Sequence, residues 1–351
     1  MRRISFSLAK CARVDFNIRA SIRAQHWGRS AFATAADARV ADARSLLEDA
    51  GGGGTVSLDT CRGDGIAVVT IDNAASRNAL TPIMMCQFAD AVAQLEEEGA
   101  SADRASSPHA AVVLRGKGGF FCSGADLRVA AKALATPAAG AAMCAFMHHW
   151  TSRFRRLPLV SVAAIAGGAV GGGTELATAC DHRLMAADAH WCMVHARHGL
   201  VPGWGGGARV QRLVGRRAAL RLLAGSAKVS AAAALRCGLA DGVVDAGRRT
   251  VTDGLGFFDD DDDEQSIDRG DGDGDGDGDD DDDAALLRAC AGWIERCGYL
   301  AWDTAAVGNA KAVVASADDA HGGSLEGALA AEHGLFCEVW PPSVIRQQQK
   351  K

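Results

Sequence analysis

The chain has 351 residues, of which 48% are hydrophobic and 23% are charged, which is enough for one large hydrophobic core or two modest ones. No apolar run reaches the roughly 18 residues of a membrane-spanning helix, so we expect no membrane contact. The net charge of −6 combines a basic N-terminus, a strongly acidic internal stretch and a mildly basic remainder. The mildly basic charge of the rest of the chain suits a small anionic ligand. It is too weak to predict a nucleic-acid partner.

The 11 cysteines include no Cys-x-x-Cys pair. An odd number of cysteines spread over apolar stretches, such as those around Cys144 and Cys180, predicts reduced thiols in an intracellular protein. His195 and His198 are three residues apart, but no further ligands follow at a metal-binding spacing. We therefore predict no metal site.

The first 30 residues contain seven basic residues and one acidic residue, Asp15. This composition is typical of a mitochondrial transit peptide, which makes mitochondria the first expectation. A disordered tail on a cytosolic protein is the alternative. Residues 31–55 end in the run Gly51–Gly54, which we interpret as a flexible linker. We therefore assign residues 1–55 to a presequence or tail with its linker.

Residues 56–250 alternate between apolar, β-rich runs and helical patterns. Thr81 suits the cap of one helix and Pro82 its first position. Strands that alternate with helices predict an α/β core. The expected strands cover residues 66–71, 111–114 and 160–165, and the expected helices cover residues 82–98 and 138–156.

Residues 251–283 differ sharply in composition from the rest of the chain. Between residues 259 and 283, 16 residues are acidic and one, Arg269, is basic, so we expect mutual repulsion to keep this stretch out of any core. Residues 271–276 superficially match a calcium loop, but its twelfth position is Asp282 instead of Glu. We interpret residues 251–283 as an acidic low-complexity insert and residues 284–351 as a C-terminal helical region.

Two glycine-rich turns, each between an expected strand and a helix, are candidates for an anion site. The turn at 167–173 precedes Glu175 and matches neither a dinucleotide fingerprint nor a phosphate loop. The second turn lies within residues 114–127. Tight packing would explain either turn alone. Two converging backbone N–H groups, however, are what a developing oxyanion needs, and Glu175 beside them favours a functional interpretation.

Four stretches, in this order, resemble signatures of the crotonase (enoyl-CoA hydratase/isomerase) superfamily: Phe121–Leu127, Gly171–Asp181, Gly199–Gly206 and Lys228–Val244. The resemblance covers about residues 60–250 and resumes in the C-terminal helices. It implies an α/β fold, a crotonase-like ββα spiral with a C-terminal helical trimerisation region, and hence a homotrimer or hexamer. It also implies an acyl-CoA thioester as the substrate and no separate cofactor.

The resemblance assigns roles to individual residues by their position in these motifs. The backbone N–H groups of Ala125 and Gly172 would form an oxyanion hole for a thioester enolate. Residues 77–80 resemble the loop of the family that contacts CoA. The CoA-contacting residues implied are Arg77, Ala79, Ala125, Asp126, Leu127 and Gly172.

His195 distinguishes two reactions of the superfamily. Hydratases place a second glutamate at this position, because water addition uses two carboxylates. With His195 there and Trp204 in the following glycine motif, the chain is similar to decarboxylating members, which convert ethylmalonyl-CoA, and less well methylmalonyl-CoA, to butyryl-CoA and propionyl-CoA. The candidate catalytic residues are Ala125, Gly172, Glu175, His195 and Trp204.

Two questions stay open from the sequence. Glu175 and His195 are both candidates for protonating the enolate. Hydration or isomerisation of a short-chain enoyl-CoA remains the alternative reaction. A non-catalytic role such as RNA binding is a third hypothesis, against which the absence of a Lys/Arg stripe argues.

Overall fold

The computed structural model describes most of the chain, namely residues 33–99, 109–245, 250–254, 278–301 and 304–319. The chain divides into two units, one of residues 40–308 and one of residues 1–39 and 309–351. The described parts of the second unit, residues 33–39 and 309–319, are helical. The sheets and all predicted site residues belong to the first unit. The predictions for residues 1–32, 255–277 and 320–351 lie outside the described residues.

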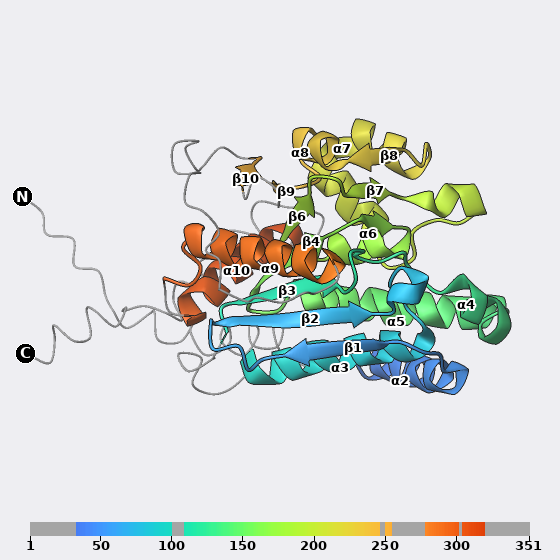
Figure 1. Cartoon of the computed structure of the whole chain (residues 1–351). Helices are drawn as coiled ribbons and strands as arrows, with labels where there is room; N and C mark the ends of the chain where they lie inside the picture. Colours follow the sequence, from blue (N-terminus) through green and yellow to red (C-terminus); the bar gives the residue numbers. More distant parts are fainter. Residues whose placement is uncertain (1–32, 100–108, 246–249, 255–277, 302–303, 320–351) are drawn as a thin grey trace, which may run out of the picture. The chain divides into compact units, whose positions relative to one another are not determined.

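Seven strands form the larger sheet, in the order β1-β2-β3-β4-β6-β9-β10. Their bounds are β1 Thr55–Asp59, β2 Ile66–Asp72, β3 Ala111–Gly116, β4 Val160–Ile165, β6 His182–Ala186, β9 Gly242–Asp245 and β10 Thr250–Asp253. The five inner strands are parallel, whereas β1 and β10 pair antiparallel at the two edges. The three expected strands are confirmed as β2, β3 and β4 (Figure 1).

A smaller sheet contains β5 Gly168–Val170, β7 His190–Cys192 and β8 Lys228–Ser230. The helices are α2 Ala33–Ala50, α3 Pro82–Gly99, α4 Leu127–Ala133, α5 Pro137–Arg155, α6 Gly172–Ala177, α7 Gly206–Leu223, α8 Ala231–Arg236, α9 Gly278–Arg296 and α10 Thr304–Asp319, with 3-10 turns η2 Ala74–Ser76 and η4 Val194–His198. The expected helices are confirmed as α3 and α5, and the Thr81 hydroxyl accepts the N–H of Met84 as predicted for a cap. None of the described helices is long and apolar enough to cross a membrane.

The larger sheet is buried on both faces, and successive residues of one strand face different clusters. In β2, Ala67 and Val69 pack in the cluster that includes side chains of α3 and α5. Their neighbours Ile66 and Val68 pack in a second cluster, to which α9 contributes Trp293. A parallel strand covered on both sides is apolar throughout, which is why the continuous runs seen in the sequence became inner strands.

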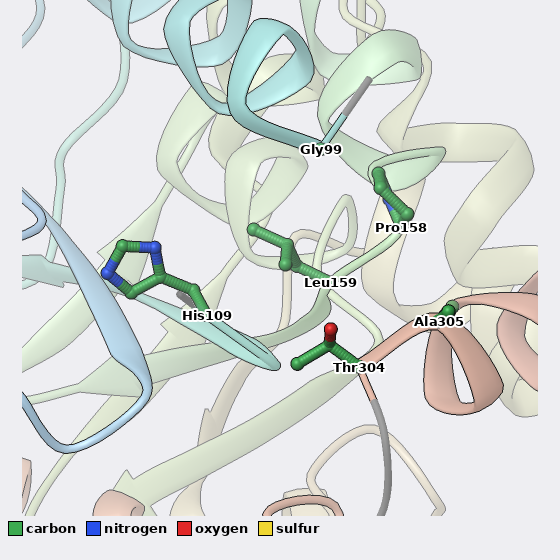
Figure 2. A pocket seen from close by; sticks show the side chains of 7 residues that line it. Gly99, His109, Pro158, Leu159, Thr304 and Ala305 are labelled. Carbon is green, nitrogen blue, oxygen red and sulfur yellow. The ribbon is translucent and has the colours of Figure 1, made fainter. Parts of the chain in front are cut away.

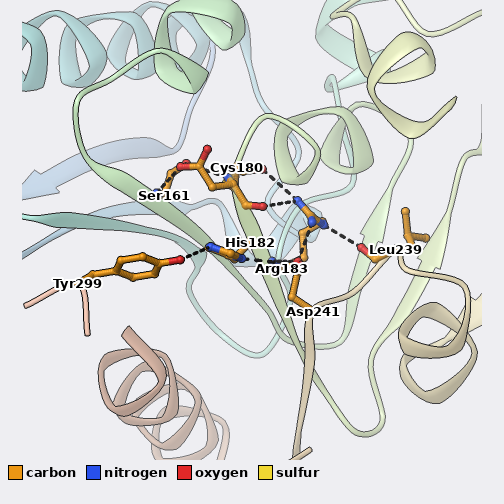
Figure 3. Close-up of polar contacts among 8 residues, drawn as sticks. Ser161, Cys180, His182, Arg183, Leu239, Asp241 and Tyr299 are labelled. Carbon is orange, nitrogen blue, oxygen red and sulfur yellow. Dashed lines mark hydrogen bonds and ion pairs between the residues drawn. The ribbon is translucent and has the colours of Figure 1, made fainter. Parts of the chain in front are cut away.

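A buried polar network ties β6 to β9 and to the turn after α9 (Figure 3). The Arg183 guanidinium is 2% exposed and lies 2.6 Å from the Asp241 carboxylate. Arg183 also donates to the carbonyl of Leu239. The neighbouring His182 ring lies 3.1 Å from the hydroxyl of Tyr299. A buried arginine needs such partners, because an unpaired buried charge is strongly destabilising.

Residues 1–55 were predicted to form a tail and linker, and this prediction is wrong for the end of α2 and for the glycine run that follows it. Leu47 in α2 is fully buried, and the Gly51–Gly54 run packs against the start of α3. A Cβ placed on Gly52 would lie 2.5 Å from the side chain of Thr81, and the Thr81 hydroxyl donates to the carbonyl of Gly53. The glycines therefore permit a close approach of two segments instead of forming a flexible linker.

The acidic insert predicted at 251–283 is folded at both ends. Its first residues belong to β10, which pairs with β9, and its last residues begin α9. Acidic residues suit a helix N-terminus, because they complement the helix dipole. Asp283 is 6% exposed, and its carboxylate accepts the N–H groups of Gly118 and Gly119 at 2.7 and 3.2 Å. Charge repulsion therefore did not exclude the end of this stretch from the fold.

Candidate active site

The backbone at Ala125 leaves one N–H group without an acceptor. Leu80 forms a parallel bridge with Ala125, in which the Leu80 N–H donates to the carbonyl of Gly124 and the Asp126 N–H donates to the carbonyl of Leu80. Because successive backbone groups alternate in direction, the N–H of Ala125 faces away from Leu80. It has no hydrogen-bond acceptor among the described residues.

The second glycine turn places another N–H group beside the first. Gly172 is the first residue of α6, so its N–H has no acceptor within the helix. Gly124, with a φ of +95°, lies against this turn: a Cβ built on Gly124 would lie 2.6 Å from the nitrogen of Gly172. The two turns thus touch, and Gly124, the residue before Ala125, lies against the backbone of Gly172.

The Glu175 side chain is 1% exposed and points to the loop before α7. Its Oε2 accepts the N–H groups of Trp204 and Gly206, both at 2.8 Å, and its Oε1 accepts that of Gly203 at 3.2 Å. A buried carboxylate with three backbone donors is well satisfied, and it fixes the conformation of the segment that donates to it. Glu175 therefore holds the loop of residues 203–206.

Trp204 is held in place through its backbone. Its carbonyl accepts from the Thr151 hydroxyl of α5 at 3.0 Å and from the Arg209 guanidinium of α7 at 2.8 Å. Its indole lies over Gly172, because a Cβ built on that glycine would lie 2.5 Å from Cζ3 of the ring. An apolar wall of defined position therefore stands beside one of the two free N–H groups.

His195 lies on η4 and pairs with Glu175. Its Nε2 lies 3.2 Å from Oε1 of Glu175, and its side chain is 12% exposed. Its Nδ1 is buried and has no hydrogen-bond partner among the described residues. His198, on the same turn, is exposed. In the described part of the chain, no group of three or more His, Cys, Asp or Glu side chains could hold a metal ion.

The loop of residues 77–80 runs alongside the Ala125 turn. Its carbonyl at Arg77 accepts the N–H of Ser123 at 3.0 Å, and the buried Asn78 side chain donates to the carbonyls of Lys117 and Phe120. Arg77 and Asn78 both have positive φ values, of 52° and 55°, which these hydrogen bonds hold in place. The Arg77 guanidinium carbon lies 6.0 Å from the centre of the Phe120 ring.

The remaining predicted CoA contacts lie on the same segment but differ in their surroundings. Ala79 is buried, and its carbonyl accepts from the side chain of Asn73. The Asp126 carboxylate caps α4 by accepting the N–H groups of Arg128 and Val129. Burial acts to raise the pKa of Asp126. These hydrogen bonds and the Arg128 charge together lower the pKa by more than burial raises it, so the net shift is downward. Leu127 is exposed. The Asp126 carboxylate is therefore committed to α4, and its backbone N–H to the carbonyl of Leu80.

Two residues that hold the site were missed in the sequence. Arg209 donates to the carbonyls of Glu175 and Trp204 and to the Thr178 hydroxyl. Burial lowers the pKa of Arg209 to about 10, although the nearby Glu175 charge acts in the opposite direction. Thr151 is fully buried beside it. In the sequence, each of these two residues is a polar side chain on the apolar face of a helix. That pattern suggests a buried polar contact but does not identify the residues it contacts.

Figure 2 shows a small hollow with a different lining. It is lined by Gly99, His109, Pro158, Leu159, Thr304, Ala305 and Gly308, none of which is a predicted site residue. The His109 ring is held there through Nε2, which lies 3.0 Å from the carbonyl of Thr60. None of the predicted catalytic residues therefore lines this hollow.

Comparisons with known proteins identify the family of the chain. The model of the enoyl-CoA hydratase/isomerase family matches residues 62–252, just over half of the chain. The ethylmalonyl-CoA decarboxylase of Danio rerio is 45% identical over 195 residues, which cover 55% of this chain and 61% of that protein. The ethylmalonyl-CoA decarboxylase of Rattus norvegicus is 42% identical over 194 residues, with the same coverage. The chain thus spans about three fifths of the length of these relatives.

Solved structures share the fold at lower identity. An enoyl-CoA hydratase from Bacillus anthracis superposes with a TM-score of 0.64 at 21% identity, covering 85% of this chain and 97% of that one. A putative enoyl-CoA hydratase from Thermobifida fusca YX in complex with CoA gives a TM-score of 0.57 at 23% identity, covering 88% and 98%. These likenesses confirm the expected α/β fold.

Proposed function

Because the chain belongs to the enoyl-CoA hydratase/isomerase family, we propose that it is a carboxy-lyase that removes CO₂ from ethylmalonyl-CoA to give butyryl-CoA. Methylmalonyl-CoA is the poorer substrate and gives propionyl-CoA. The observation that carries this proposal is the pairing of Glu175 with His195, together with the N–H groups of Ala125 and Gly172, which have no acceptor among the described residues. That arrangement can stabilise an enolate but lacks the second carboxylate expected for water addition.

The chemistry begins when the bond between the α-carbon and the carboxylate breaks. CO₂ leaves, and the electron pair moves onto the thioester oxygen as an enolate. The N–H groups of Ala125 and Gly172 donate to this oxygen, and the loss of one such donor typically costs about 2.7–4 kcal/mol in the barrier. The donors are backbone groups fixed by the contact of their two turns, so they need no reorganisation during the reaction.

Trp204 forms the apolar wall against which the departing carboxylate lies. Its ring position beside Gly172 brings it close to the thioester, and its backbone contacts with Glu175, Thr151 and Arg209 keep it there. A carboxylate that loses water against an apolar wall is destabilised relative to uncharged CO₂.

The CoA moiety lies along the loop of residues 77–80 and the turn that follows β3. Arg77 supplies positive charge for a phosphate group of the nucleotide. Ala79, Ala125, Asp126 and Leu127 contribute backbone contacts, and Gly172 contributes its N–H. The reaction takes no separate cofactor, because CoA is part of the substrate.

The proposal is tested with purified protein and three substrates in parallel: ethylmalonyl-CoA, methylmalonyl-CoA and crotonyl-CoA, with the products identified by mass. We expect butyryl-CoA and CO₂ from the first substrate and a slower reaction with the second. Chelator should leave the rate unchanged. Loss of activity on chelation, with recovery on addition of a divalent ion, would refute the metal-free reaction. Hydration of crotonyl-CoA alone would establish the hydratase alternative.

We also propose that the protein assembles as a homotrimer or hexamer. The resemblance to the superfamily implies this, because it implies a C-terminal helical trimerisation region. Light scattering at several protein concentrations tests this, and a monomer at all of them would refute it.

For the location, we propose mitochondria, on the basic composition of the first 30 residues. A fluorescent reporter fused after these residues should enter mitochondria. A diffuse cytosolic signal would favour the tail interpretation instead.

A further inference from the structure

The carboxylate of Glu175 is committed to the protein. Oε2 accepts two N–H groups at 2.8 Å, and Oε1 accepts the N–H of Gly203 at 3.2 Å and lies 3.2 Å from the His195 ring. The stem is packed as tightly, because a Cβ placed on Gly206 would lie closer to Cγ of Glu175 than any non-bonded carbon can approach. Both oxygens of this carboxylate therefore act as hydrogen-bond acceptors within the protein.

The His195 ring is in the opposite situation. Nε2 faces Glu175, whereas Nδ1 is buried without a partner among the described residues. A buried nitrogen without a hydrogen bond is costly and uncommon, and a catalytic role is one of the few reasons for which such a group is kept. The partner on Nε2 determines the orientation of the ring and which nitrogen is free to donate.

The turn that carries His195 lies against the oxyanion site. Its carbonyl accepts the N–H of Leu200 at 2.9 Å, which closes the turn. The neighbouring Val194 packs on the glycine turn, since a Cβ on Gly171 would contact Val194 Cγ2 at 3.5 Å. Gly171 immediately precedes Gly172, whose N–H is one of the two free donors. His195 therefore directly follows the residue that packs on the glycine turn of the proposed oxyanion site.

We propose that His195 is the catalytic acid that protonates the α-carbon, and that Glu175 is a positioning residue that holds the ring through Nε2. This inference rests on the proposed function. After CO₂ has left, the enolate pair forms a new C–H bond with the proton of Nδ1, and the N–H bond of the imidazolium breaks. The imidazole that remains takes up a proton from water, so the net reaction consumes one proton and releases one CO₂.

The test is decarboxylation of ethylmalonyl-CoA in D₂O, with the rate and the configuration of the deuterated α-carbon both measured. The wild-type protein should deliver deuterium to one face. In His195→Gln, turnover should fall by about 10²–10⁴, the usual contribution of a positioned acid. The enolate that still forms should take deuterium from solvent on either face, so both configurations should appear.

His198→Gln is the matched control, because His198 is exposed on the same turn, and it should behave as wild type. His195→Asn, a second variant with a shorter amide, should also lose stereospecificity. Glu175→Gln should slow the reaction but keep a single configuration, since the acid is still present. Wild-type rate and one configuration in both His195 variants would overturn the assignment while leaving the proposed function intact. A wild-type protein that releases no CO₂ would instead refute the proposed function itself.

Discussion

The indole of Trp204 lies directly over Gly172, so that a Cβ built on this glycine would lie 2.5 Å from Cζ3 of the ring. The ring cannot simply move away, because the Trp204 backbone is hydrogen-bonded to Glu175, Thr151 and Arg209. The glycine is therefore required by the approach of an aromatic side chain as well as by the donation of its N–H. This contact couples the apolar wall of the site to the oxyanion donor.

Gly172→Ala should therefore displace either the ring or the N–H. We expect kcat/KM for decarboxylation to fall by about 10²–10³, which corresponds to the loss of one oxyanion donor. Steady-state kinetics measures the change. Gly140→Ala in α5 is the control, because a Cβ there would meet no atom within 4 Å, and its activity should match that of the wild type. Equal kcat/KM for the Gly172 variant and the wild type would contradict the assignment of this donor.

The carboxylate of Asp283 joins the start of α9 to the Gly118–Gly119 turn. Asp283→Ala should reduce the free energy of unfolding by about 1–3 kcal/mol, because two partly buried backbone N–H groups lose their acceptor. Urea denaturation monitors the effect. Asp282→Ala, an exposed neighbour, should change stability little. If the two variants unfold at the same urea concentration, the end of the acidic stretch does not contribute to the fold as described.

Asp241 makes stability depend on pH. Burial acts to raise the pKa of Asp241, but the Arg183 charge and the neighbouring His182 outweigh it, so the pKa lies below its usual value of 3.8. The stabilisation from this carboxylate is therefore present above the unfolded-state pKa and is lost as the pH falls through the lower, folded-state pKa. Its loss contributes to acid unfolding.

Asp241→Asn should be less stable than the wild type by about 3–5 kcal/mol at pH 7, the cost of breaking a buried ion pair. The difference should shrink as the pH falls below about 4. Denaturation curves recorded from pH 7 to pH 3 test this, with Asp188→Asn as an exposed control. A difference that stays constant over this range would show that the stabilisation does not come from the ionised form.

The sequence predicted the elements whose pattern is local. The strand at 160–165 is a continuous apolar run, and α3 begins with a capping threonine and a proline, so both were found. Strand β1 was missed because its five residues directly follow the glycine run, which resembles a linker. Strands of three residues, such as β5, are too short to show a period.

The residues of the candidate site could be predicted from the sequence, but the hydrogen bonds among them could not. The motifs identified Ala125, Gly172, Glu175 and His195, yet they could not rank the last two as proton donors. That ranking depends on the bonds from residues 203–206 to the Glu175 carboxylate, about 30 positions along the chain. Such bonds are set by tertiary packing, which no local pattern encodes.

Two rate constants of the wild-type protein, measured in one preparation, distinguish a decarboxylase from a hydratase: kcat/KM for CO₂ release from ethylmalonyl-CoA and kcat/KM for hydration of crotonyl-CoA, compared as the ratio of the first to the second. With Glu175 paired to a histidine instead of a second carboxylate, the ratio should lie far above one. Hydration of crotonyl-CoA at roughly hundreds of turnovers per second, high in the usual enzyme range, while ethylmalonyl-CoA stays intact would show that the protein is a hydratase and not a decarboxylase.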